Sequence, residues 1–338
     1  MPLQRYGVLK GRPIDRRLAI ANSSHYQIHV IDGKVDYRVA INVSSNVYPA
    51  ELEYALDHHF EHPIIDRLPR LSPGFKPLEP RPDSLALDMI RGNLLQPGQM
   101  VPIPSTLPGP DNDLNEKIDY YIQRAMADEL AMLYAFGELW GPKSTLRDPI
   151  FGFEPHCGIH NIHMNQGNHA VHQEDDGIWQ DGGLLLNFPE QEEWVALFLK
   201  FQSQCWHTDD RTGHCQTIKP ILKHQPSHPT VTASPVKIVA ALVNPLGDDR
   251  GKETVTLLNL SPETIDLTNW AIANQFKQKQ ILQGAIAPGE ARTIHLKPEV
   301  RLDNDGGIIT LLDHEGSKVH GVTYSYRQAH RAGWTIKF

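Results

Sequence analysis

The stretch His25–Val43, HYQIHVIDGKVDYRVAINV, decides how the first part of the chain folds. Two runs rich in β-branched and aromatic residues flank Asp32-Gly33-Lys34, and a glycine-containing turn between such runs predicts a β-hairpin. Polar and apolar residues alternate along the first run. Because side chains alternate between the two faces of a strand, His25 and Gln27 share one face, and Asn42 lies on the second strand.

Outward from the hairpin, the pattern predicts helices separated by irregular segments. Residues 50–60 predict a short helix, and a second short helical piece is expected at 84–91. An Asn/Asp cluster opens an apolar stripe at helical spacing, which predicts a long helix over 111–139. A further stripe predicts a helix over 190–205. Residues 61–110 are rich in proline and glycine, which is typical of a wrapped surface layer or a loop near a site.

From Val236 the pattern changes to short β-rich runs separated by turn residues, which favours a β-sandwich. These runs are VKIVAALV, ETVTLLNL, DLTNWAIA, ARTIHLK, GIITLLD and VHGVTY. The sequence therefore predicts an α+β domain over 1–220, a proline-rich linker over 221–235 and an all-β immunoglobulin-like sandwich over 236–338.

Composition restricts the classes of protein. The chain has 338 residues, which is long enough for two domains. The net charge is −8, and the first 235 residues carry 20 basic and 29 acidic residues. This balance gives no footprint for non-specific nucleic-acid binding. No apolar run approaches the length of a membrane span, no signal peptide is visible and the three cysteines form no disulfide framework. A cytoplasmic protein without membrane contact is expected.

Residues 151–186 concentrate histidines and amides more densely than a core or a solvated face requires. Glycines within the stretch disfavour a helix, so strands and loops are expected to hold these side chains. Histidine is the commonest metal ligand, and a divalent cation, zinc or manganese, is the predicted cofactor if one is bound. The predicted metal ligands are His160, His163, His207 and Asp209. The predicted catalytic side chains are His25, His163, Asn165 and Asp181, and the predicted substrate-binding side chains are Gln27, Asn42, Gln166 and Asn168. A purely structural role, in which the histidines hydrogen-bond loop backbone, stays open.

A second mechanism comes from a partial resemblance to phospholipase D-type enzymes. That family uses two His-x-Lys elements, in which one histidine attacks phosphorus and the other protonates the leaving group. His25-Tyr26-Gln27 has this outline with glutamine in place of lysine, and His163-Met164-Asn165 has it with asparagine. The missing lysines remove the charges that would bind phosphate.

Two longer resemblances cover most of the chain. GKETVTLLNLSPETIDLTNWAIA, APGEARTIHL and DGGIITLLDHEGSKVHGVTY resemble the lamin-tail domain, an immunoglobulin-like module with Trp270 as the expected core tryptophan. RYGVLKG, HYQIHV, RVAINVSS, IRGNLL, GPDNDL, YAFGELWG, GIHNIHMNQGN, WQDGGLL and FQSQCWHTDDRTG resemble the YukJ-like family of conserved proteins of unknown function. The second resemblance implies an architecture and supplies no activity.

The leading functional hypothesis is a hydrolase, of the phosphodiesterase or nuclease-like class, acting on a small-molecule or phosphodiester substrate. The density of histidines and amides supports it, as does the frequent occurrence of the lamin-tail module beside nucleases and other phosphoesterases. One alternative is a non-catalytic ligand-binding or scaffolding protein whose sandwich docks a protein partner. Another is a carbohydrate-active enzyme, which would need paired catalytic carboxylates.

Overall fold

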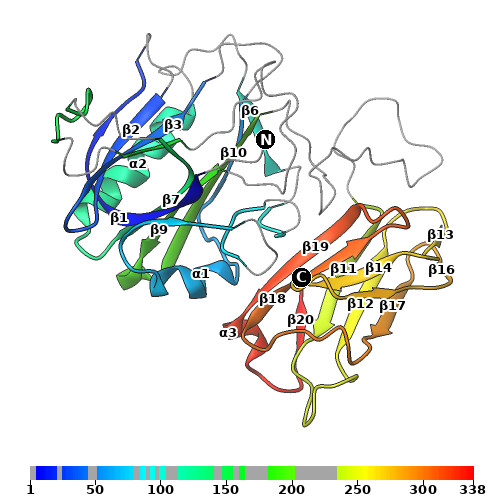
Figure 1. Cartoon of the computed structure of the whole chain (residues 1–338). Coiled ribbons are helices and arrows are strands. Elements are labelled where there is room, and N and C mark those ends of the chain that lie inside the picture. The colour runs from blue at the N-terminus through cyan, green and yellow to red at the C-terminus, as the bar shows by residue number, and fades with distance from the viewer. Residues whose placement is uncertain are drawn as a thin grey trace. The chain divides into compact units, whose positions relative to one another are not determined.

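The computed structural model describes residues 5–20, 25–44, 52–79, 84–88, 92–95, 99–103, 113–140, 147–154, 160–163, 182–201 and 234–338. Over these residues the protein is mostly β-structure, with several antiparallel sheets and few helices (Figure 1). The chain divides into two compact units. The first unit comprises Met1–Phe60, Asp66–Asp88 and Gln99–His214, and the second comprises Glu61–Ile65, Met89–Gly98 and Cys215–Phe338.

The first unit is built on one sheet, in which the described strands are hydrogen-bonded in the order β5-β1-β2-β3-β8-β7-β9-β10-β4-β6. These strands are β1 (Tyr6–Arg17), β2 (His25–Ile31), β3 (Asp36–Asn42), β4 (Leu52–Asp57), β5 (Gly74–Pro77), β6 (Val101–Ile103), β7 (Met132–Trp140), β8 (His160–His163), β9 (Gly182–Phe188) and β10 (Glu193–Phe201). Its helices are α2 (Asp113–Ala127) and the 3-10 turns Leu68–Arg70 and Pro189–Gln191, and the boundary between the two units runs through α1 (Ile64–Arg67).

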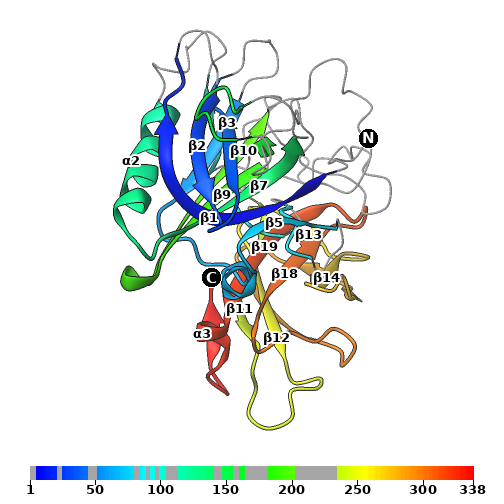
Figure 2. The same cartoon turned by 60° about the vertical axis from the view of Figure 1, so that its left-hand side comes forward.

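Strand β1 closes part of this sheet on itself. Its first half pairs with β7 and its second half pairs with β2, with a register shift between Pro13 and Asp15. A bulge of this kind bends a strand, and Figure 2 shows β1 as a long curved strand. Since β2 pairs with β3, β3 with β8 and β8 with β7, the pairing returns to β1.

Helix α2 covers one face of this arrangement (Figures 1 and 2). Its buried residues Ile118 and Ile122 join a hydrophobic cluster that also contains Tyr26 of β2 and Leu133 of β7. The hydroxyl of Tyr26 donates a hydrogen bond to Asp119 Oδ1 at 2.8 Å. The apolar face of the predicted hairpin is therefore the core face, and the predicted β2–β3 hairpin is confirmed.

Four helix predictions are wrong in whole or in part. Residues 50–60 contain strand β4, in which Leu52 and Tyr54 face the core with period two. Residues 190–205 contain strand β10, which lies between β9 and β4. Both faces of β10 are buried, so its apolar residues form a nearly continuous run that cannot be distinguished from a helix by periodicity.

The long helix also ends earlier than predicted. Helix α2 ends at Ala127, and the backbone turns at Asp128, whose carboxylate accepts a hydrogen bond from the Leu130 nitrogen at 2.9 Å. Strand β7 then begins at Met132. The predicted helical piece at 84–91 is absent from the described residues 84–88.

The second unit contains two four-stranded antiparallel sheets, β17-β12-β11-β20 and β15-β14-β18-β19, and the pair β13-β16. Its elements are β11 (Val236–Leu242), β12 (Thr254–Asn259), β13 (Ile265–Asp266), β14 (Ala271–Asn274), β15 (Lys279–Ile281), β16 (Ala285–Ile286), β17 (Ala291–His295), β18 (Gly306–Leu312), β19 (Lys318–Ser325), α3 (Tyr326–Ala329) and β20 (Thr335–Lys337). Residues of both sheets share one core cluster, and Trp270 is buried in it. The predicted β-structure of this part is confirmed. All but the last two residues of the predicted linker lie outside the described residues.

Two short segments from earlier in the chain also belong to the second unit. Asn93 has a φ of 55° and is almost fully buried. Its amide nitrogen lies 3.1 Å from the Ile309 carbonyl oxygen and 3.2 Å from the Val322 carbonyl oxygen. A Cβ atom built on Gly321 would lie 2.0 Å from Asn93 Oδ1. The absence of a side chain at Gly321 is therefore what admits the Asn93 amide.

We expect Gly321→Ala to lower the free energy of unfolding of the second unit by about 1–3 kcal/mol, because the new methyl group overpacks the site. Chemical denaturation of the intact chain measures this change. In the Asn93→Gly/Gly321→Ala double variant the clash is gone, so the loss should be smaller than the sum of the two single losses. Strictly additive losses would contradict this account of the contact.

His320 of β19 makes the second unit sensitive to acid. Burial, followed by the charges of Lys318 and Lys237, lowers the pKa of His320 to about 4. Its Nδ1 accepts a hydrogen bond from the Ile238 nitrogen at 3.2 Å. Nδ1 of His320 must be unprotonated to accept this bond. The neutral imidazole is therefore the form that the fold accommodates.

The folded pKa of His320 lies below the unfolded value, so its stabilising contribution is complete above pH 6.5 and is lost as the pH falls toward 4. The loss amounts to about 3 kcal/mol by pH 4. The His320→Asn variant keeps an acceptor and does not titrate, so its unfolding free energy should fall less over this range. Urea denaturation at pH 7 and pH 4.5 tests the prediction, and parallel losses in both proteins would refute it.

None of the helices in the described part of the chain combines the length and apolar composition needed to cross a membrane.

Candidate functional site

The site begins with the polar face of the β2–β3 hairpin. The register pairs His25 with Asn42 and His29 with Arg38, so these four side chains emerge on one face. Gln27 lies between the two histidines on β2 and shares this face, as predicted from the alternation in the sequence. The opposite face contributes to the core.

Arg38 organises the centre of this face. Its Nε donates to Asp148 Oδ2 at 2.7 Å, and one terminal nitrogen donates to Gln27 Oε1 at 2.9 Å. The Arg38 side chain is 10% exposed and that of Asp148 is fully buried. Burial of both charges makes this ion pair structurally demanding, since removal of either partner leaves an uncompensated charge.

The loop that contributes Asp148 is fixed by its own hydrogen bonds. Asp148 Oδ1 accepts from the nitrogens of Ile150 and Phe151 at 3.0 and 2.9 Å. The Asp148 nitrogen donates to the Phe153 carbonyl oxygen at 3.1 Å. The described loop 147–154 is therefore held against the polar face of the hairpin, immediately before the histidine-rich stretch.

His25 is poised in its neutral form at this face. Burial is the main cause of the lowered pKa of His25, and the positive charge of Arg38 adds to it. A neutral imidazole carries a lone pair that can accept a proton or attack an electrophile, so His25 has the protonation state that a base or nucleophile requires at neutral pH.

His29 is held by a carboxylate and two aromatic rings. Its Nε2 lies 2.7 Å from Asp36 Oδ1. The ring stacks on Phe151 with a centroid separation of 5.1 Å and lies 5.2 Å from the ring of Phe153. The guanidinium of Arg17 lies over the ring of Phe151, 5.3 Å from its centroid. These contacts orient the imidazole and close this side of the site.

Strand β8 brings two predicted site residues next to the hairpin. Parallel pairing places the backbone of His160 beside Tyr37 and that of His163 beside Ala40. Since β3 lies between β2 and β8, the backbones of His25 and His163 are two strands apart, about 9.5 Å across the sheet. Through Ala40, the backbone of His163 lies in register with Gln27, and His25 lies two residues farther along β2. That the side chains of His25 and His163 act together stays a prediction.

Glu138 of β7 borders the same region from the other side. Its backbone pairs with His163, and its carboxylate accepts from the Arg5 nitrogen at 3.1 Å. Burial raises the pKa of Glu138, and the hydrogen bond from Arg5 opposes this shift.

The structure describes only part of the predicted site. Asn165, Gln166, Asn168, Asp181, His207 and Asp209 lie outside the described residues. Asn42 is half-buried, and its Oδ1 lies 3.4 Å from the Ser44 nitrogen. Within the described ranges, no three or more His, Cys, Asp or Glu side chains gather around a common metal position. The metal ligands His160, His163, His207 and Asp209 therefore stay a prediction.

Sequence reasoning missed the group that organises the site. In the sequence, Arg38 is one charged residue within a β-rich run, and Asp148 is an isolated carboxylate. The one available signal was the alternation of Asp36, Arg38 and Asn42, which places Arg38 on the face opposite the core.

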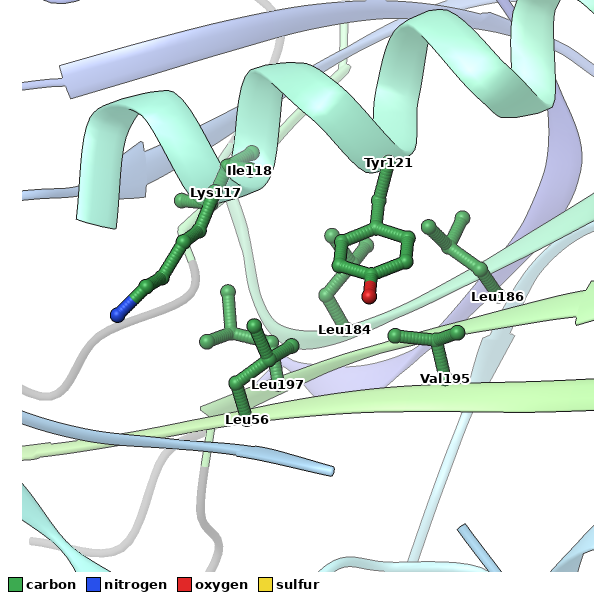
Figure 3. A pocket seen from close by; sticks show the side chains of 8 residues that line it. All are labelled: Leu56, Lys117, Ile118, Tyr121, Leu184, Leu186, Val195 and Leu197. Atoms are coloured by element: carbon green, nitrogen blue, oxygen red, sulfur yellow. The ribbon is translucent and has the colours of Figure 1, made fainter. Parts of the chain in front are cut away.

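A small apolar pocket lies elsewhere in the first unit, between α2 and strands β4, β9 and β10 (Figure 3). Its lining residues are Leu56, Lys117, Ile118, Tyr121, Leu184, Leu186, Val195 and Leu197. The Lys117 ammonium donates to the Tyr54 hydroxyl at 2.7 Å, and the Tyr121 hydroxyl contacts His58 Nδ1. Six of its eight lining residues are aliphatic, and the polar ends of Lys117 and Tyr121 contact Tyr54 and His58, so this pocket does not have the converging polar groups that mark a reactive site.

Comparison with known proteins places the candidate site within a recognised family. The chain is 42% identical over 214 residues to the "Uncharacterized protein YukJ" of Bacillus subtilis (strain 168). The alignment covers 62% of this chain and 93% of that relative. The model of the family described as "Uncharacterized conserved protein (DUF2278)" matches residues 1–213. These residues include the hairpin, the Asp148 loop and β8, and the chain belongs to this DUF2278 family of conserved proteins.

Proposed function

We propose that the first unit is a hydrolase of phosphodiesters that uses a pair of histidines, His25 and His163. The observation that supports it best is the neutral His25 on the same sheet face as the buried Arg38–Asp148 pair. Strand β3, which carries Arg38, pairs directly with β8, which carries His163. Gln27 occupies the lysine position of the phospholipase D-type outline. Arg38 of β3, hydrogen-bonded to Gln27, supplies the neighbouring cation instead.

The proposed reaction has two steps. In the first, the lone pair of His25 attacks phosphorus, the P–O bond to the leaving alcohol breaks, and His163 donates its proton to the departing oxygen. In the second, water attacks phosphorus, His163 takes the proton of this water, and the bond between phosphorus and His25 breaks. Burial and the positive charge of Arg38 keep His25 unprotonated between turnovers, and the same charge favours the negative phosphoryl group.

Asn165, Asn168 and Asp181 are proposed to orient the substrate or the histidines, and Gln166 and Asn42 to contact it. The alternative is a metal route, in which His160, His163, His207 and Asp209 would hold a zinc or manganese ion and the ion would supply activation of the attacking water in place of His25. The two routes share the substrate class and differ in their metal requirement.

A substrate screen on the purified intact chain tests this proposal. Bis(4-nitrophenyl) phosphate, 4-nitrophenyl phosphate and 4-nitrophenyl acetate distinguish a diester, a monoester and a carboxylic ester. Each is assayed after EDTA treatment and after addition of Zn²⁺ or Mn²⁺.

The histidine-pair mechanism predicts turnover of the diester that survives EDTA. Turnover only with added metal would replace it by the metal route. Lack of diester turnover under every condition would leave a non-catalytic binding role, which the full engagement of Gln27 and Asp148 by Arg38 also accommodates.

For the second unit, we infer a lamin-tail-like immunoglobulin fold that docks a protein partner. The segments that carry the resemblance overlap strands β12, β13, β14, β17, β18 and β19. Trp270 is 3% exposed within the core cluster. An experimental structure of the intact chain tests the assignment through its strand topology. A pulldown with the intact chain as bait tests the docking role.

A further inference from the structure

Glu253, which immediately precedes β12 in the second unit, is a fully buried acid with an unsatisfied oxygen. The residue is 0% exposed. Oε1 accepts a hydrogen bond from the Leu302 nitrogen at 2.8 Å, whereas Oε2 is buried without a hydrogen-bond partner. A buried carboxylate oxygen without a partner is energetically costly unless a cation, a proton or a donor completes it.

A second buried oxygen without a partner lies in the loop that contacts Glu253. Asn304, two residues beyond Leu302, donates from Nδ2 to Asp249 Oδ2 at 2.7 Å. Asn304 Oδ1 is buried and has no hydrogen-bond partner. The Asp249 side chain is 13% exposed. The loop of Leu302 and Asn304 thus contacts Glu253 through the Leu302 nitrogen and Asp249 through the Asn304 side chain.

The charges around these oxygens are predominantly negative. The carboxylate of Asp249 adds a second negative charge near that of Glu253, and the charge of Arg301 opposes it. Arg301 is 3.8 Å from Asp249 Oδ2, but its side chain is 59% exposed to solvent, which weakens its influence. The field at the buried oxygens therefore favours a positive species.

We propose that the loops 247–253 and 299–304 bind a hard divalent cation, Ca²⁺, through side-chain oxygens of Asp249, Glu253 and Asn304. Carboxylate and amide oxygens are ligands that Ca²⁺ prefers, and backbone carbonyls and water complete its six to eight ligands in proteins. With two carboxylates and one amide, this donor set differs from a group of three or more His, Cys, Asp or Glu side chains, of which the described residues contain none.

The rival explanation is a proton in place of the cation. A protonated Glu253 could donate from Oε2 to Asn304 Oδ1 and satisfy both atoms. The two explanations differ in their response to metal ions. Cation binding to the folded state raises the unfolding temperature as the concentration of the cation increases, whereas a protonated carboxyl group gives no such response.

The test is calorimetry of the intact chain, first treated with EDTA and then titrated with CaCl2, with MgCl2 and NaCl at matched ionic strength. We expect saturating Ca²⁺ to raise the unfolding temperature of the second unit by about 5 °C or more. Glu253→Gln should abolish this response. Asp248→Asn, which changes an exposed acid of the same loop, should retain it.

A direct binding measurement covers the case in which Glu253→Gln fails to fold. Asn304 is only partly buried, so Asn304→Ala should fold, and isothermal titration with CaCl2 should show affinity reduced about tenfold or more relative to the unchanged chain. No shift and no heat of binding with either Ca²⁺ or Mg²⁺ in the unchanged chain would overturn the proposal in favour of the proton. An equal response in Glu253→Gln and the unchanged chain would also overturn it.

Discussion

Replacing Arg38 with methionine is expected to lower the free energy of unfolding of the first unit by about 3–5 kcal/mol. The substitution keeps most of the aliphatic volume and removes the guanidinium. It leaves the fully buried Asp148 carboxylate without its cation and Gln27 Oε1 without its donor. Urea denaturation of the intact chain, followed by a probe of the first unit, measures the loss.

A matched ion pair in the same loop provides the control. Arg147 pairs with Glu154, but the Arg147 side chain is 71% exposed. Arg147→Met should therefore cost less than about 1 kcal/mol. In the Arg38→Met/Asp148→Asn double variant no buried charge remains, so part of the stability lost in Arg38→Met should return. Equal losses for the two arginine variants would contradict the central role of the Arg38–Asp148 pair.

The second large effect concerns activity. We expect His25→Gln to lower kcat/KM for a phosphodiester by about 100-fold or more, because the proposed nucleophile is lost while the amide preserves polarity at the position. The measurement is steady-state turnover of bis(4-nitrophenyl) phosphate by the intact chain. The unfolding temperature is recorded alongside, so that lost folding is separated from lost chemistry.

Two histidine variants calibrate this result. His314 is exposed in the second unit, and His314→Gln should leave kcat/KM unchanged. His29 lies on the same face of β2 as His25, where Asp36 and two phenylalanine rings orient it. His29→Gln should cost less than His25→Gln because His29 shapes the site without attacking phosphorus. A larger loss at His29 would move the reactive role from His25 to the His29–Asp36 pair.

The parts of the fold that were predictable have patterns with one clear period. The His25–Val43 hairpin alternates polar and apolar residues around a glycine turn, and the structure pairs the two strands as expected. The runs after Val236 each carry turn residues at both ends, and the structure contains a strand in each run. In both regions local preference and tertiary packing agree.

The parts that were missed have patterns which tertiary context decides. β10 is buried on both faces between two neighbouring strands, so its apolar run carries no alternation. α2 ends at Ala127 because the chain turns at Asp128 and pairs as β7 with β1, a partner more than a hundred residues earlier. Such non-local pairing leaves no trace in a local window of sequence.

The candidate site was predictable only in its histidines and amides. His25 and Gln27 could be assigned to one strand face because strand geometry is local. Arg38 and Asp148 are 110 positions apart, and only the folded chain shows that they form a buried pair. The lowered pKa of His25 results from burial and then from the charge of Arg38, and neither could be derived from the sequence.

The most direct measurement of the central claim is the pH dependence of kcat/KM for a phosphodiester, determined on the intact chain after EDTA treatment. Neutral His25 is the proposed attacking form, and burial and Arg38 lower its pKa below 6.5. The rate should therefore rise with pH along a limb whose apparent pKa lies below 6.5, and this limb should be absent from the residual activity of His25→Gln. An identical limb in His25→Gln, or no diester turnover at any pH, would contradict the account.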